Sequence, residues 1–237
     1  WVNVGWFSLA APLVALWLRR LTGSWAPGWV GGALHAVSLA AVIRSTGQEI
    51  SHENFALPWA VAHLALISGP FGRGGREIAR WLCAALTLAI ALATWDLVQY
   101  LVALEGVVLL AAWWWEPYGW RDRRARPLWA IAGGVGLAAV WSPYHRVHGL
   151  IVSPAVWPLW ATVAALATAR RSTRALRWRA ALVAAIVVIG VASVGTVRWS
   201  GAYGHFGSLV VAKLRHGNRK PADPSRLTFD QRILWTP

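Results

Sequence analysis

The sequence predicts an all-α integral membrane protein: a bundle of seven or eight transmembrane helices followed by a short basic C-terminal tail. Two features of the composition predict this class. Hydrophobic residues make up 57% of the chain and charged residues only 14%, whereas a soluble domain carries roughly a quarter charged residues. The third observation is that clusters of arginine separate the apolar runs. Cytoplasmic loops of membrane proteins retain Lys and Arg while short translocated loops lack them, so this pattern also predicts an orientation.

Four clusters hold 14 of the 23 Lys and Arg residues. They are Arg19 and Arg20; Arg73, Arg76 and Arg80; Arg121, Arg123, Arg124 and Arg126; and Arg170, Arg171, Arg174, Arg177 and Arg179. The turns near 45–56, 95–97 and 142–148 are poor in basic residues. We therefore expect the basic loops in the cytoplasm and both termini outside it, in a membrane of the bacterial inner type.

Eight apolar runs are candidate spans, because a spanning helix needs about 20 residues, with a range of roughly 17–25. The runs are 1–18, 28–44, 57–72, 81–95, 97–115, 128–142, 149–169 and 180–198. Pro27 and Pro127 stand just before the second and sixth runs, where proline suits a helix start. Run 57–72 is short, and the number of spans is seven if it does not cross.

The stretch from Trp81 to Trp115 is too long for one span. As a single helix it would extend about 52 Å at 1.5 Å per residue, against a hydrocarbon core of ~30 Å. We expect two helices joined by a tight turn near Trp95 and Asp96. Residues 1–198 then form the membrane bundle. Residues 199–237 form a basic extramembrane tail, in which 203–215 could make a short interfacial amphipathic helix.

The net charge of +14 lies mostly beside apolar runs. The expected partner is therefore the lipid bilayer, whose anionic surface attracts each nearby basic residue by about 1 kcal/mol. Nucleic acid is not expected, because binding it requires a basic stripe on a soluble face. The 19 tryptophans lie mostly at run ends and predict an interfacial aromatic belt. Alternatively, some of these rings stack on a bound pigment or lipid.

His35 and His63 each stand alone near the middle of an apolar run, and the topology puts them at similar depth. Facing imidazoles could ligate a haem, and either one alone could ligate the magnesium of a (bacterio)chlorophyll. Ionisable side chains inside a membrane are costly and are functional candidates. A proton relay is another interpretation. The simplest alternative is that each ring bonds to a carbonyl or hydroxyl of a neighbouring helix, such as Ser38 or Ser68.

A second set of polar residues is expected together on the non-cytoplasmic face. Its members are Glu49, His52, Glu53, Asp96, His145, His148 and His205. Imidazoles and carboxylates suit zinc or another borderline metal, and His52, Glu53, His145 and His148 are the candidate ligands. The same groups could perform acid–base chemistry. The alternative is a solvated loop surface.

Three polar residues in or beside run 97–115 are candidate intramembrane groups. Asp96 and Gln99 share a helix face with Tyr100, because residues three and four apart are neighbours. Glu105 is expected deeper and on the opposite face, where it is neutral, paired with an Arg of another subunit or used for proton coupling. A helix–helix hydrogen bond is the simplest role for these groups.

No P-loop, dinucleotide fingerprint, GxSxG or HExxH pattern is present. The first functional hypothesis is therefore a structural or cofactor-holding subunit of a larger photosynthetic or respiratory membrane complex, with other membrane subunits as partners. The alternative is a membrane-embedded enzyme or transporter with a His/carboxylate site on the non-cytoplasmic face. A third reading is a small electron carrier that resembles cytochrome b and uses His35 and His63.

Overall fold

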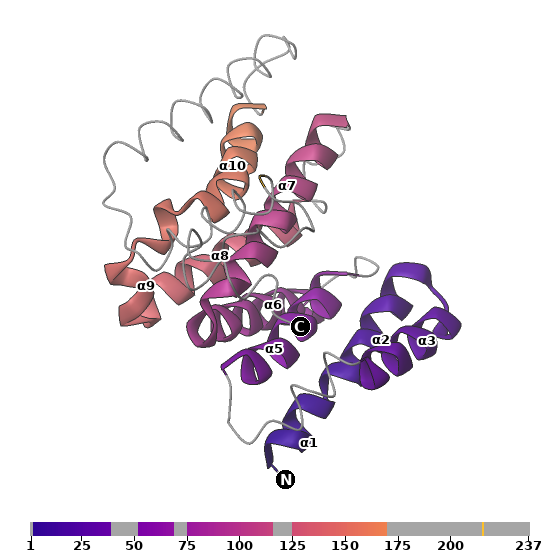
Figure 1. The fold of residues 1–237 in the computed structure, drawn as a ribbon. Helices are drawn as coiled ribbons and strands as arrows, with labels where there is room; N and C mark the ends of the chain where they lie inside the picture. Colours follow the sequence, from indigo (N-terminus) through magenta and orange to yellow (C-terminus); the bar gives the residue numbers. More distant parts are fainter. Residues whose placement is uncertain (1, 39–51, 69–74, 116–124, 170–214, 216–237) are drawn as a thin grey trace.

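A computed structural model describes residues 2–38, 52–68, 75–115, 125–169 and 215, and within these ranges the chain is helical with no strand, as predicted (Figure 1). The elements are α1 (Val2–Ser8), α2 (Ala10–Thr22), α3 (Trp25–Val37), α5 (His52–Ile67), α6 (Gly75–Thr94), η1 (Asp96–Val98), α7 (Gln99–Trp115), α8 (Arg126–Trp141), α9 (Pro143–Val147), η3 (Leu150–Val152), η4 (Pro154–Val156) and α10 (Trp157–Ala169).

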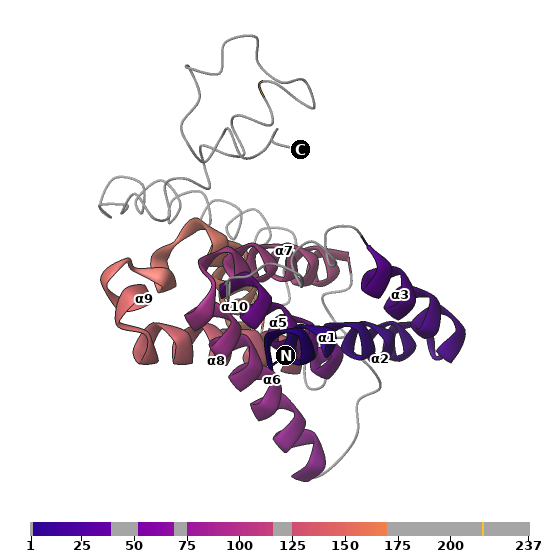
Figure 2. The ribbon, with the colours of Figure 1, turned by 60° about the horizontal axis from the view of Figure 1, so that its bottom comes forward.

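The helices pack in a chain of neighbours rather than around one axis. The order is α3 on α2, α2 on α5, α5 on α6 and α6 on α8, while α7 packs against α10 (Figures 1 and 2). The main core lies where α6, α7, α8 and α10 meet, around Leu88, Val102, Ile131 and Leu159. Each of these side chains is at most 1% exposed.

Three helices are long and apolar enough to cross a membrane: Val4–Thr22, Gly75–Thr94 and Asp96–Trp115. The helix Asn54–Ile67 is apolar but shorter. The seven or eight crossings expected from the sequence are therefore not confirmed. The run 180–198 and the tail after residue 198, apart from Arg215, lie outside the described residues.

The predicted break within the long apolar stretch is confirmed. Helix α6 ends at Thr94, and Trp95 is extended (φ −147°, ψ 116°) before the short turn of η1 leads into α7. The two helices then diverge, because α6 packs against α5 and α8 whereas α7 packs against α10. The chain returns along α7, and α8 then runs parallel to α6. The contact between Glu77 and Arg126 shows this direction, because each residue lies near the start of its helix.

Two of the expected runs differ from the structure, one because proline divides it and the other in where it ends. Run 149–169 is not one helix, since η3, η4 and α10 share it. Ser153 is extended (φ −68°, ψ 151°) before Pro154, because the residue preceding a proline disfavours helical backbone. In run 1–18, Leu9 between α1 and α2 keeps helical backbone (φ −63°, ψ −20°), and the helix continues past Arg19 to Thr22. Gly23 then takes a left-handed conformation (φ 74°), and its N–H donates to the Arg19 carbonyl.

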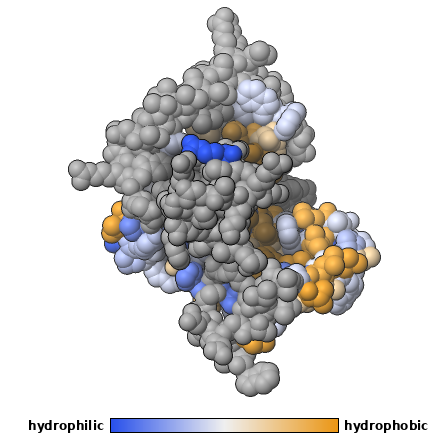
Figure 3. All heavy atoms as spheres, viewed as in Figure 1, coloured by the Kyte–Doolittle hydropathy of each residue, from blue (hydrophilic) through white to orange (hydrophobic). Residues whose placement is uncertain are grey.

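One face of α3 is apolar and exposed. Its side chains include Trp29 at 68%, Leu34 at 63% and Val37 at 73% exposure. Figure 3 shows the apolar residues gathered on the side of the molecule that α2 and α3 form. Helix α3 packs closely only on α2 among the described elements. This face has no close partner among the described elements.

Candidate functional site: a buried histidine–glutamate pair

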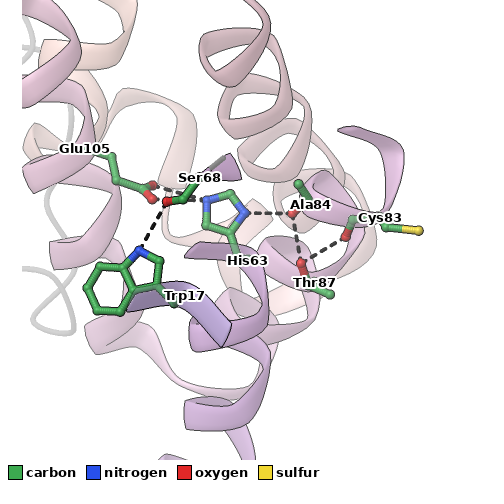
Figure 4. Close-up of polar contacts among 7 residues, drawn as sticks. All are labelled: Trp17, His63, Ser68, Cys83, Ala84, Thr87 and Glu105. Atoms are coloured by element: carbon green, nitrogen blue, oxygen red, sulfur yellow. Dashed lines mark hydrogen bonds and ion pairs between the residues drawn. The ribbon is translucent and has the colours of Figure 1, made fainter. Parts of the chain in front are cut away.

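A buried contact between two ionisable side chains joins His63 of α5 to Glu105 of α7. The Nε2 atom of His63 lies 3.1 Å from Oε1 and 3.3 Å from Oε2 of Glu105, and Nδ1 lies 2.8 Å from the backbone oxygen of Ala84 in α6 (Figure 4). His63 is fully buried and Glu105 is 8% exposed. One imidazole therefore links three helices.

The hydrogen bond to Ala84 fixes the protonation of the imidazole. A carbonyl oxygen only accepts, so Nδ1 of His63 must carry hydrogen and donate to Ala84. The Nε2 atom then faces Glu105 either as an N–H of imidazolium that donates to a carboxylate, or as a lone pair that accepts from a protonated carboxyl. In both forms one proton lies between the two residues. Without it, a ring lone pair would face a carboxylate at 3.1 Å.

The pair sits about halfway along α6. Ala84 is seven residues after Glu77 and eight before Leu92, which places it about 10 Å and about 12 Å from those two levels at 1.5 Å per residue. Apolar side chains fill α6 on either side, with Trp81 towards Glu77 and Leu88 towards Leu92. The proton-holding pair is therefore enclosed at mid-depth of a helix that is long enough to span a membrane.

His35 and His63 are not brought together as a facing pair. Helix α2 packs on both α3, which carries His35, and α5, which carries His63. The ring of His35 lies 6.2 Å from that of Phe7, and both ring nitrogens of His63 are engaged by Ala84 and Glu105. The carbonyl bond expected as the simplest role is found for His63, with Ala84 in place of Ser38 or Ser68. Glu105 has its partner in this chain.

Part of the polar set expected on one face does come together, at the end of the bundle where α6 stops. His145 is 2% exposed and its Nε2 lies 2.7 Å from the backbone oxygen of Leu92. The ring of Tyr144 lies 5.5 Å from His145 and 4.3 Å from His148. Asp96 is close enough to act electrostatically on His145 and Tyr144. The sequence also allowed a solvated loop surface here, but His145 is buried.

The metal ligands expected from the sequence are only partly placed. His52 is exposed at the start of α5. The side chain of Glu53, and all of Glu49 and His205, lie outside the described residues. Among the described residues, no three His, Cys, Asp or Glu side chains gather closely enough to hold a metal ion. The metal site stays a prediction.

The other intramembrane candidates lie near the start of α7. Asp96 belongs to η1 and is half-buried, while Gln99 opens α7 and is 4% exposed. The charge of Asp96 acts on Tyr100, as expected for residues four apart on a helix. The polar patch predicted for these residues is thus placed at the turn, separate from Glu105.

Sequence reasoning missed a second buried acid. Glu77 of α6 is 4% exposed, and its Oε2 lies 2.5 Å from Nη1 of Arg126 in α8. The indole N–H of Trp81 also donates to Glu77 Oε1 at 3.4 Å. The available signal was a lone acid inside the basic segment that contains Arg73, Arg76 and Arg80.

Burial lowers the pKa of His145, although the bond to Leu92 and the charge of Asp96 act in the opposite direction. The folded chain therefore binds a proton at His145 less readily than the unfolded chain does.

The stability of the folded chain is then expected to fall as the pH drops below about 6.5, the ordinary pKa of histidine. His145→Gln can still donate to Leu92 but gains no charge, so it should weaken this dependence. Thermal unfolding in detergent on either side of that pH measures it. The exposed His52→Gln is the control, and an equal effect there would contradict the assignment.

No family model matches the chain, and neither a curated protein nor a solved structure is significantly similar to it.

Proposed function

We propose that this chain is an integral membrane protein that binds and releases a proton at His63 and Glu105, as part of proton-coupled transport. The observation that carries the proposal is the fixed hydrogen on Nδ1, because it makes the Nε2–Glu105 contact depend on one further proton. Ionisable residues at membrane depth mark proton relays and coupled transport sites.

The packing around the pair supports exchange by a change of helix contacts rather than through an open channel. His63 is fully buried and its partners lie on two other helices. Release of the shared proton leaves a carboxylate against a lone pair, which favours separation of α5 from α7. Proton release and the movement of α5 relative to α7 are then coupled, because the two helices differ in their contact when the proton is present and when it is absent.

Proton uptake tests the proposal directly. The purified chain is reconstituted in liposomes that contain a pH-sensitive dye, and a membrane potential is imposed. We expect acidification above that of empty liposomes, and its loss in Glu105→Gln and His63→Gln. In infrared difference spectra, the band of the Glu105 carboxyl group, in whichever of its two forms it occurs, should also disappear in Glu105→Gln. Wild-type liposomes that behave as empty ones would overturn the proposal.

Thr87→Val is the matched control for these variants. The Thr87 hydroxyl donates to the same Ala84 oxygen at 3.0 Å, but it has no contact with the shared proton (Figure 4). It should therefore keep the proton flux and the infrared band. Equal loss in Thr87→Val would show that the variants act on helix packing and not on the proton.

A second candidate function is a subunit of a larger photosynthetic or respiratory membrane complex. The exposed apolar face of α3, with Trp29, Leu34 and Val37, supports it, because lateral contacts between membrane proteins need such a face. Purification in mild detergent should then bring partner subunits along, and Leu34→Arg should release them. A stable monomer with no partner would argue against this role.

The haem or chlorophyll hypothesis is tested in the same preparation. Its weak point is His63, whose two nitrogens are both engaged, so the remaining candidate ligand is His35. An absorption spectrum with a Soret or chlorophyll band that disappears in His35→Ala would establish a pigment there. A colourless protein would remove this hypothesis.

A further inference from the structure

The segment between α8 and α10 consists of the short elements α9, η3 and η4, none of which is long enough to cross a membrane. Both α9 and η3 pack on α8, and α9 lies at the edge of the molecule opposite to α3 (Figures 1 and 2). Because His145 of α9 bonds to Leu92 of α6, the segment lies at the level where the span Gly75–Thr94 ends.

The outward side of this segment is apolar. Val147 of α9 is 81% exposed, and Val140 at the end of α8 is 70% exposed. The exposed apolar and aromatic side chains are Val140, Trp141, Tyr144, Val147, Ile151 and Val152, and we call them the α9 surface. Exposed apolar groups that gather in one place mark a contact with a protein or with a membrane.

The backbone of η3 is hydrogen-bonded by side chains of the same chain. The indole N–H of Trp157 donates to the Val152 oxygen at 3.0 Å, and that of Trp160 donates to the Ile151 oxygen at 2.6 Å. A turn in water can leave such carbonyls to solvent, but an unpaired backbone group is costly towards the hydrocarbon, where water is scarce. The two indole groups therefore make η3 suited to an environment poor in water.

The charge of the segment favours lipid as the partner of the α9 surface. Positions 140–152 contain no Asp or Glu, and their one arginine, Arg146, is exposed. A guanidinium nitrogen (Nη2) of Arg146 donates to the Val140 oxygen, which holds the charge beside the exposed apolar side chains. Apolar side chains together with a cation are typical of segments that lie in the interface of a membrane with anionic lipids.

We propose that α9 and η3 lie in the plane of the lipid interface, with Val147 and Ile151 inserted among the lipids at the boundary of headgroups and acyl chains. The segment then fixes the depth of the end of α6, because His145 of α9 bonds to Leu92. This inference rests on the membrane location of the chain and not on the proton site. Absence of proton flux would therefore leave it unchanged.

Paramagnetic resonance of a nitroxide label at position 147 tests the α9 surface. The one cysteine of the chain, Cys83, is replaced by Ser, and Val147→Cys is labelled in the full chain, in liposomes of phosphatidylcholine and phosphatidylglycerol. Oxygen concentrates in lipid, whereas a nickel chelate stays in water. We expect the label to collide more often with oxygen than with the chelate, at a depth of about 5–10 Å in the interface.

His52→Cys and Val108→Cys give the two reference values. His52 is exposed at the start of α5, so a label there should be accessible to the nickel chelate. Val108 is exposed within the span Asp96–Trp115, so a label there should be accessible to oxygen and not to the chelate. A label at 147 that behaves like the one at 52 would overturn the inference. Protection from both reagents would also overturn it, because a protein contact, including a second copy of the chain, would then cover the surface.

Ile151→Cys gives an independent position on the same surface. Val147 and Ile151 are both exposed, so neither replacement removes a side chain from the core, and both variants should keep the fold. The label at 151 should give the same preference for oxygen as the label at 147. Chelate access at 151 equal to that at 52 would contradict the insertion of η3.

Discussion

Replacing Glu105 by Leu is expected to lower the free energy of unfolding by at least about 1 kcal/mol, and by about 3–5 kcal/mol if the pair is ionised. The lower value is the penalty for a buried donor or acceptor that loses its partner. The higher value is the penalty for leaving one charge of a buried ion pair alone. His63 is fully buried and bonded to Ala84, so it cannot turn to water without losing that second bond. Unfolding in mixed micelles measures the loss.

The double variant His63→Leu/Glu105→Leu should recover most of that stability. Replacing both members of a buried pair by apolar side chains is often neutral or stabilising. A double-mutant cycle then gives the coupling energy, and hydrogen bonds in one helical membrane protein average only about 0.6 kcal/mol in such cycles. A coupling energy well above that value indicates the ionised form. No destabilisation in Glu105→Leu would contradict the contact itself.

The same double variant separates stability from function. If the pair serves only to join α5 to α7, a folded Leu/Leu protein should keep whatever activity the wild type has. If the pair holds an exchangeable proton, the folded double variant should lack proton flux in liposomes. A stable but inactive double variant would therefore support the proposed function, and a stable and active one would reject it.

The positions of the helices could be predicted from the sequence more completely than the contacts between them. Apolar runs, and the length argument between Trp81 and Trp115, located α6, α7 and the turn at Trp95, because these depend on local composition and on the rise per residue. Where proline interrupts an apolar run, hydropathy alone failed. It predicts 149–169 as one helix, although the chain is extended at Ser153 before Pro154 and α10 begins only at Trp157.

The candidate site shows why pairing was harder to predict. His63 and Glu105 were both identified as costly intramembrane groups, but their contact depends on which faces α5 and α7 present across α6, and no single run encodes that. The sequence predicts His35 as the neighbour of His63, because their apolar runs follow one another along the chain. Instead α2 packs between the two helices that carry them. Glu77 lies in an arginine-rich segment that is typical of a loop, and its burial depends on Arg126 of another helix.

Gly134→Ala is expected to destabilise the packing of α8 on α6, whereas the neighbouring Gly133→Ala should not. A Cβ atom at Gly134 would lie 2.9 Å from the backbone oxygen of Ala85 and 2.9 Å from Cδ2 of Leu88. A Cβ atom at Gly133 would have only the Ala85 Cβ atom nearby, at an ordinary 3.6 Å. Small residues of this kind let membrane helices approach closely, and the backbone of Ala85 cannot move aside as a flexible side chain could.

The two variants form a matched pair. Both replace a glycine in the interior of α8, so both gain about 0.5–1 kcal/mol of helix stability, and that gain cancels in their comparison. The remaining difference is the cost of overpacking, about 1–3 kcal/mol. Because Ala85 follows Ala84, which bonds His63, a shift of α6 at Gly134→Ala should also weaken proton flux, while Gly133→Ala should keep it. Equal stability of the two variants would show that a Cβ atom at Gly134 has more room than a distance of 2.9 Å to the Ala85 oxygen allows.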